Sequence, residues 1–248
     1  MKKLLLLFLL PFLSTPLLAE GFNDNYLQLG YSTSDYKHTD KITNVSGSVE
    51  FGNNYLLSGS YSYEKGDWND PGEYETKTLK KISIGVEKYF PLNSTTDITS
   101  SLSYEDWDQK QICKAKDHIT YADGYDCTHS YTNGGIVKAD FSHTSIGIRN
   151  LTASGFEISL KNTWSRLRGT GVTNSDYYTP SIGVRNISDS GLESSFKYSI
   201  DKSVPVKSSQ IEFELIKHIN KNFAIGGSIV SHKKADWTEN GIFVRRSF

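Results

Sequence analysis

The chain has 248 residues, of which 37% are hydrophobic and 22% charged, and its formal net charge at pH 7 is -1. This near-neutral balance gives no support to a nucleic-acid partner. No stretch after residue 20 approaches 18 consecutive apolar residues, which excludes a helical membrane protein. The chain also lacks a linker-like or low-complexity stretch, so one folded domain over residues 20–248 is predicted.

Residues 1–19 have the features of a cleaved secretory signal peptide. Lys2 and Lys3 form a positive start, residues 4–13 are apolar, and a plausible cleavage site ends at Ala19. The apolar stretch is short for a helix that spans a membrane. Without Lys2 and Lys3, 25 of the 27 basic residues remain against 28 acidic residues, so the mature chain has a net charge near -3.

After the signal peptide, short segments alternate apolar residues with small polar or charged ones. In the first segment, Leu27 and Leu29 form an apolar row, and Gln28 and Gly30 lie in the opposite row. Twelve segments show this period of two, which is typical of β-strands: they are 25–34, 43–52, 54–64, 78–90, 96–107, 136–149, 155–166, 176–186, 191–201, 208–218, 222–232 and 240–248.

The pattern predicts an all-β fold, a transmembrane antiparallel up-and-down β-barrel of about 12 strands. A soluble β-sandwich would also alternate. However, the polar row here is rich in small residues and charges, as a crowded lumen requires, and the segments are about ten residues or longer. The mean hydropathy of -0.45 fits, because only every second strand residue of a barrel must be apolar. Residues 136–143 do not alternate cleanly, so ten or fourteen strands remain as alternatives.

The connections between the segments differ in length, which predicts an orientation. Short turns, expected on the periplasmic side, lie at 53–54, 91–95, 150–154, 186–190 and 218–221. The other connections are mostly longer and are expected to face outward: 35–42, 65–77, 108–135, 167–175, 202–207 and 233–239.

Two cysteines, Cys113 and Cys127, lie in the longest polar segment. Because an exported chain passes through an oxidising compartment, a disulfide between them is predicted. The alternative is a pair of free thiols. Two cysteines fall short of the four ligands of a structural zinc site, and no metal site is predicted.

An internal repeat supports the hairpin arrangement. Residues 145–157 recur 36 residues later as residues 181–193. The repeat predicts a duplicated hairpin in which Arg149 lies opposite Glu157 and Arg185 lies opposite Glu193, where opposite charges stabilise neighbouring strands.

These four residues belong to a larger set of charges in the polar rows. We refer to the set as the lumen charge belt, and its members are Glu50, Lys81, Glu87, Arg149, Glu157, Lys161, Arg185, Glu193, Lys197, Glu212, Glu214 and Arg245. Six are acidic and six are basic, which predicts weak ion selectivity if the lumen conducts ions.

The signal at 1–19, the opening strand at 26–31, the hairpin at 51–55 and the closing strand at 240–248 resemble those of small outer-membrane β-barrel proteins of Gram-negative bacteria, the OmpA-like and porin-like group. The resemblance implies a location in the bacterial outer membrane, in contact with membrane lipid and lipopolysaccharide. It also implies recognition by the outer-membrane assembly machinery through alternating residues of the last strand, here Ile242, Val244 and Phe248. Arg246 departs from that pattern.

The resemblance favours a porin-like role, which means passive passage of small hydrophilic solutes, or a structural role if charged side chains fill the lumen. A surface adhesion or interaction protein that acts through its outer loops is the alternative. An outer-membrane hydrolase is a third hypothesis, for which the histidines expected on the outer side are candidates: His38, His118, His129, His143 and His232. The sequence has no Gly-x-Ser-x-Gly turn, His-Glu-x-x-His helix or glycine-rich phosphate loop, so neither an enzyme nor a cofactor is predicted.

Overall fold

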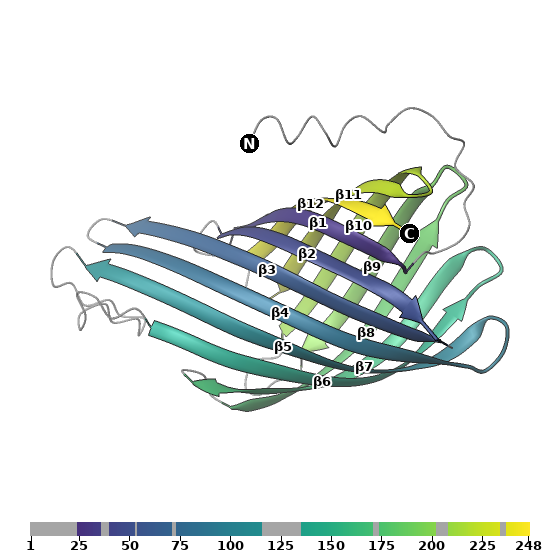
Figure 1. The fold of residues 1–248 in the computed structure, drawn as a ribbon, viewed down its shortest axis with the longest axis horizontal. Coiled ribbons are helices and arrows are strands. Elements are labelled where there is room, and N and C mark those ends of the chain that lie inside the picture. Colours follow the sequence, from purple (N-terminus) through teal and green to yellow (C-terminus); the bar gives the residue numbers. More distant parts are fainter. Residues whose placement is uncertain are drawn as a thin grey trace.

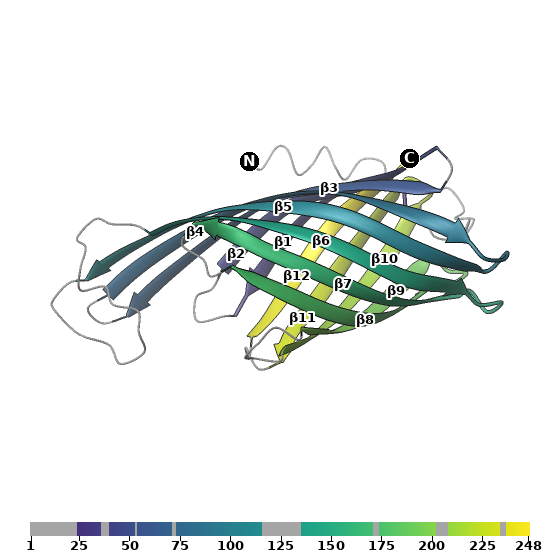
Figure 2. The ribbon, with the colours of Figure 1, turned by 90° about the horizontal axis from the view of Figure 1, so that it is seen from below.

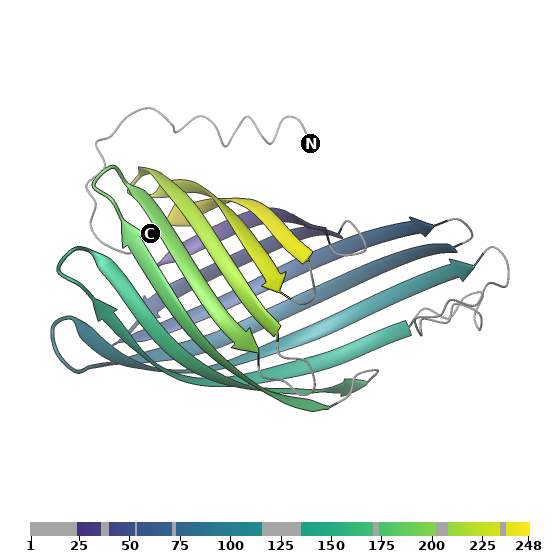
Figure 3. The same cartoon turned by 180° about the vertical axis from the view of Figure 1, so that it is seen from behind.

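Twelve antiparallel strands form a closed barrel (Figures 1–3). A computed structural model describes residues 24–35, 40–52, 54–70, 73–115, 135–170, 174–201, 208–233 and 237–248. The strands are β1 (Tyr26–Ser34), β2 (Asp40–Phe51), β3 (Tyr55–Asp70), β4 (Glu73–Pro91), β5 (Thr96–Ala115), β6 (Gly135–Leu151), β7 (Phe156–Thr170), β8 (Ser175–Ile187), β9 (Leu192–Asp201), β10 (Ser208–Asn220), β11 (Phe223–Lys233) and β12 (Trp237–Ser247). The predicted all-β fold and strand number are confirmed.

The barrel closes between its first and last strands. Leu29 of β1 pairs with Val244 of β12 on one side and with Val45 of β2 on the other. Each strand therefore has two hydrogen-bonded neighbours and no edge remains. Among the described residues, no helix is long and apolar enough to cross a membrane.

The two faces of the wall differ in chemistry. Large apolar side chains such as Ile84, Leu102 and Leu160 point away from the barrel and are exposed. A continuous exposed apolar surface of this kind is rare on soluble proteins and is what a bilayer requires. The opposite row faces the lumen, because Lys161 of β7 contacts Glu87 of β4 at 3.1 Å although these strands are not neighbours.

Strands β3 to β6 are longer than the sequence pattern predicts, with 16, 19, 20 and 17 residues. They project beyond the rest of the barrel on one side (Figures 1 and 2). Most of the predicted outer connection at 65–77 is therefore strand, as are 108–115 and 135. Strand outside a membrane faces water on both sides, so it needs no apolar row, and the alternation that predicts strands is absent there. We call this side the loop end and the other the turn end.

The repeated segments form equivalent turns at the turn end. In both, a glycine with positive φ ends the turn, Gly155 at 79° and Gly191 at 70°. In both, a hydroxyl accepts the amide four residues later, at 3.0 Å from Thr152 and 3.2 Å from Ser188. The duplicated hairpin thus has a local origin in the turn residues.

The predicted register of these hairpins is wrong by two residues. Arg149 pairs with Ser159 and Arg185 with Ser195, so neither arginine lies directly opposite its expected glutamate. The left-handed glycine places the centre of each turn one residue later than assumed. The glutamates then lie diagonally across from the arginines, still within reach of a long side chain.

The predicted disulfide lies partly outside the described residues. Cys113 belongs to β5, whereas Cys127 falls in the undescribed stretch 116–134. The bond therefore stays a prediction, and so does the signal peptide at residues 1–19.

A charge on the outer face should destabilise the barrel in lipid. Leu160 is 51% exposed and lies on β7 between Phe156 and Trp164, which face the same way. Replacing it by arginine (Leu160→Arg) should lower the free energy of unfolding by about 2 to 4 kcal/mol, because a guanidinium near the bilayer centre is poorly solvated. Denaturant titration of the protein refolded in lipid vesicles measures this change.

The neighbouring lumen position is the matched control. Lys161→Arg keeps a cation on the opposite face, and the change expected there is within about 0.5 kcal/mol. Equal losses in both variants would contradict the assignment of the two faces.

Candidate functional site in the barrel lumen

The structure places the lumen charge belt in the inward rows and pairs most of its members. The nitrogen–oxygen distances are 3.1 Å for Lys161–Glu87, 3.6 Å for Arg149–Glu157, 2.7 Å for Arg185–Glu193, 3.5 Å for Lys197–Glu212 and 3.7 Å for Arg245–Glu214. Lys81 lies 4.7 Å from the ring centre of Trp107. Glu50 lies exposed at the turn end, where its amide donates to Asn25 Oδ1 at 2.6 Å.

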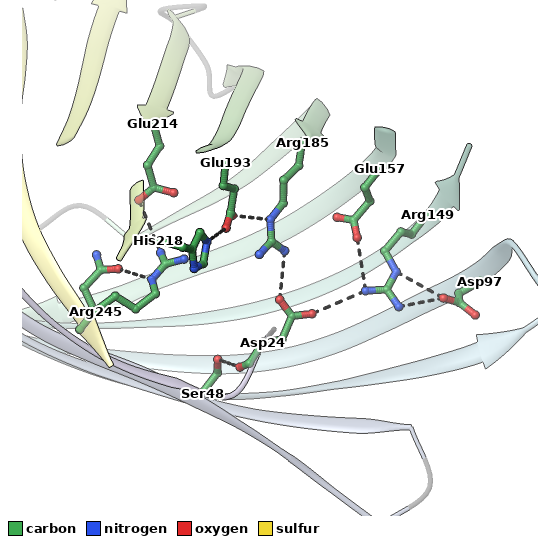
Figure 4. Close-up of polar contacts among 11 residues, drawn as sticks. Asp24, Ser48, Asp97, Arg149, Glu157, Arg185, Glu193, Glu214, His218 and Arg245 are labelled. Carbon is green, nitrogen blue, oxygen red and sulfur yellow. Dashed lines mark hydrogen bonds and ion pairs between the residues drawn. The ribbon is translucent and has the colours of Figure 1, made fainter. Parts of the chain in front are cut away.

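Polar side chains near the turn end form two neighbouring groups, a larger one around Asp24 and Glu193 and a smaller one that pairs Arg245 with Glu214 (Figure 4). We call the two groups together the turn-end network, and its members are Asp24, Asp97, Arg149, Glu157, Arg185, Glu193, Glu214, His218 and Arg245. The network lies on the lumen side of the wall and contains both signs of charge, so each buried group has a partner that offsets the loss of its hydration.

Asp24 is the residue that crosses the lumen. Its carboxylate lies 3.0 Å from Arg185 of β8 and 3.8 Å from Arg149 of β6 (Figure 4). Asp24 directly precedes the first strand, and β6 and β8 are each five strands away from β1 around the wall. The carbonyl oxygen of Asp24 also accepts a hydrogen bond from the Ser48 hydroxyl of β2. Asp24, two residues before β1, therefore narrows the lumen at the turn end.

Glu193 anchors one side of the network and is only 3% exposed. One carboxylate oxygen accepts from Arg185 Nε at 2.7 Å, and the other lies 2.9 Å from His218 Nε2. Both oxygens of this buried group thus have partners, which offsets the cost of removing its charge from water.

Aromatic rings support two of the arginines. The guanidinium of Arg149 lies 4.2 Å from the ring centre of Tyr89 and donates to Asp97 at 2.8 Å. That of Arg245 lies 4.4 Å from the ring of Tyr26 and donates to Gln28 at 2.9 Å. Such stacking holds the planar group while its edges bind carboxylates.

The structure adds lumen charges that the sequence pattern did not include: Asp24, Asp40, Glu64, Lys77, Asp97, Glu105 and Glu239. Strict extension of the polar rows within the predicted strands would have found Glu64, Asp97 and Glu105. Nothing in the sequence marks Asp24, because it precedes the first strand. Together with the charge belt, the described lumen-facing residues comprise twelve acids and seven bases, so the lumen has an excess of negative charge.

A second ion-paired group lies nearer the loop end. Lys77 Nζ of β4 is 2.7 Å from Glu64 of β3 and 3.7 Å from Asp40 of β2. The lysine therefore links three neighbouring strands across their lumen face.

Two of the candidate histidines lie in the lumen, and the other three fall outside the described residues. His143 Nδ1 is 2.7 Å from the Ser165 hydroxyl, and His232 stacks on Trp237 with ring centres 3.6 Å apart. In the described part of the wall, no carboxylate binds the other ring nitrogen of His143, as a serine-hydrolase arrangement requires. Over the same residues, no group of three or more His, Cys, Asp or Glu side chains could hold a metal ion.

The predicted assembly residues all point outward from the last strand. Ile242 is 69% exposed and Phe248 64%, and Val244 is also exposed. Arg246 shares this face, and its guanidinium lies 5.8 Å from the ring centre of Phe223 at the turn end. A cation at the edge of the apolar band can reach water, which explains how the row accommodates it.

Comparison with solved structures places the fold among bacterial outer-membrane barrels. The KdgM porin in complex with disordered oligogalacturonate is 11% identical with a TM-score of 0.62, over 90% of this chain and 99% of that one. The NanC porin is 8% identical with a TM-score of 0.59, over 90% of this chain and 98% of that one. The transport unit of the autotransporter AIDA-I from Escherichia coli is 12% identical with a TM-score of 0.57, over 99% of this chain and 97% of that one. No family model and no curated protein matches the chain.

The chain thus has the closed antiparallel β-barrel fold that is also found in porins and in the transport units of autotransporters, and its outer face is apolar, as a bilayer requires. The resemblance of its sequence to outer-membrane barrels is confirmed at the level of the fold.

Removing the Glu193 carboxylate should destabilise the barrel. In Glu193→Ala, Arg185 keeps Asp24 but loses its closest partner, and His218 loses its carboxylate. A loss of about 3 kcal/mol in the free energy of unfolding is expected, because a buried cation is left undercompensated. Denaturant titration in lipid vesicles measures it.

Glu212→Ala is the control for this prediction. Both side chains of the Glu212–Lys197 pair are solvent-exposed, so its loss should lower the free energy of unfolding by less than about 1 kcal/mol. Similar values for the two variants would show that burial does not set the strength of the network.

Proposed function

We propose that this protein is a porin-like channel for small hydrophilic solutes. The observation that carries the proposal is a contrast between the two faces of the closed barrel wall. The exterior is apolar, and the lumen is lined by serines, threonines and charged groups. A lumen of this composition is suited to water and polar solutes rather than to a dry core. Two of the similar structures are the KdgM and NanC porins, which supports the same role here.

The proposal includes a location in the bacterial outer membrane, reached through a cleaved signal peptide at residues 1–19 that leaves the barrel domain 20–248. The turn end then faces the periplasm, because outer-membrane barrels have short periplasmic turns. The outer face contacts membrane lipid and lipopolysaccharide, and Ile242, Val244 and Phe248 are the residues that the assembly machinery reads. Neither an enzymatic activity nor a cofactor is part of the proposal.

The turn-end network limits what passes. Twelve strands enclose more space than the eight of a side-chain-filled barrel and far less than a sixteen-stranded porin. Within this space, Asp24 links two arginines of the opposite wall. We therefore place the narrowest part of the path at the periplasmic end, where Asp24 forms part of its lining.

The surface-interaction hypothesis depends on the third outer connection, with its predicted disulfide, and on the aromatic second and sixth connections. Residues 116–134 of it lie outside the described part of the chain. That hypothesis stays a prediction from the sequence, next to the observation that β3 to β6 project from the loop end (Figure 1).

Single-channel recording in planar bilayers tests the proposal. The refolded protein should give steady conductance steps, and Asp24→Ala should increase the conductance by about twofold, because the side chain that narrows the lumen and its contacts with two arginines are removed. Asp176→Ala is the control, since Asp176 pairs with Arg166 and Arg168 on the outer face and is exposed.

Heat-modifiable gel migration confirms in parallel that each variant has formed a barrel. A folded barrel without conductance would contradict the channel proposal. Equal conductance of wild type and Asp24→Ala would show that Asp24 does not limit the width of the path.

A further inference from the structure

Four aromatic side chains lie together on the lumen side of β5, β6 and β8. The ring centre of Phe141 is 4.7 Å from that of Trp107, 5.7 Å from that of His143 and 6.3 Å from that of Tyr177. The planes of Phe141 and His143 differ by only 5°. We call Trp107, Phe141, His143 and Tyr177 the aromatic wall. It lies closer to the loop end than the turn-end network does.

The rings lie beside two buried apolar side chains of the lumen-facing rows. Trp107 pairs with Ala139 and Phe141 pairs with Leu167. Ala139 and Leu167 are only 1% and 8% exposed, although they face the lumen, whereas Trp107 and Phe141 remain partly exposed. The result is an apolar platform inside an otherwise polar channel.

Three of the four rings of the aromatic wall differ from Tyr89 and Tyr26 in having no described cation above them. Tyr89 and Tyr26 lie beneath the guanidinium groups of Arg149 and Arg245. Of the four rings of the aromatic wall, Trp107 alone lies beneath a described cation, that of Lys81. A phenyl ring such as that of Phe141 has no polar atom, and its exposure to an aqueous lumen is unfavourable. A ligand that covers the ring would offset this cost.

Polar groups border the platform. Trp107 Nε1 donates to the Glu105 carboxylate, the Ser165 hydroxyl bonds to His143, and Lys81 lies beside Trp107. Apolar faces with a few convergent polar groups are typical of ligand sites. A pyranose ring matches this arrangement, because its C–H faces are attracted to the negative faces of aromatic rings while its hydroxyls bind the polar groups at the edge.

The charge of the lumen selects among such solutes. The described lumen-facing residues contain twelve acids and seven bases, so a polyanionic chain is repelled along the path. From these observations we infer that the aromatic wall is a binding subsite for neutral oligosaccharides. The inference rests on the proposed channel function and names its substrate class.

Current block by defined sugars tests the inference. Cellohexaose and maltohexaose are added to wild-type channels in planar bilayers, and oligogalacturonate and tetraethylammonium serve as the anionic and cationic comparisons. At least one neutral sugar should block wild type more strongly than either charged compound. Trp107→Ala and Phe141→Ala should each weaken this block about tenfold, which corresponds to about 1.4 kcal/mol.

Trp164→Ala is the matched control, because Trp164 is exposed on the outer face and should leave the block unchanged. A conducting channel that neither neutral sugar blocks, a block unchanged in both lumen variants, or stronger block by either charged compound would overturn the inference.

Calorimetric titration of the detergent-refolded protein with the same sugars separates this inference from the channel proposal. Binding that Phe141→Ala weakens supports the subsite even where no current is seen. Conductance without sugar binding retains the channel and rejects the subsite.

Discussion

The constraint on which the whole structure depends is the need to pair every backbone amide and carbonyl inside a bilayer that offers no water. A closed barrel meets this need, because β1 pairs with both β2 and β12 and leaves no edge. Closure also separates the residues of each strand into a lipid-facing row and a lumen-facing row. The fold therefore determines which side chains contact solutes, and the rest of the chemistry follows from what those rows contain.

The lumen of a twelve-stranded barrel is narrow enough for side chains of opposite walls to meet. Asp24 reaches arginines five strands away, and Lys161 reaches Glu87 three strands away. Because a buried charge needs a partner, most of these groups are ion-paired, and Asp24 and Glu193 each bind two partners. The path therefore has a charged part at the turn end, formed by the turn-end network, and an apolar part nearer the loop end, formed by the aromatic wall.

The period-two pattern predicted twelve strands, since it arises from the same contrast of lipid and lumen that forms the barrel. It failed where that contrast is absent. Residues 65–70 and 73–77, expected in an outer connection, are strand that projects beyond the rest of the barrel. Residues 136–143 do not alternate cleanly, but they belong to β6, as the predicted segment 136–149 requires. The predicted register of the two repeated hairpins was wrong because each turn contains a left-handed glycine, Gly155 in the first and Gly191 in the second. The contacts of Asp24 could not be predicted at all, because they join parts of the wall that only barrel closure brings together.

The central claim is that the lumen is an aqueous path whose field is set by its excess of acidic groups. The most direct measurement is the reversal potential of the refolded protein in a planar bilayer with a KCl gradient. The twelve acids and seven bases among the described lumen residues predict selectivity for potassium over chloride, in place of the weak selectivity expected from the six acids and six bases identified in the sequence. A chloride-selective channel, or a folded barrel without current, would contradict the account.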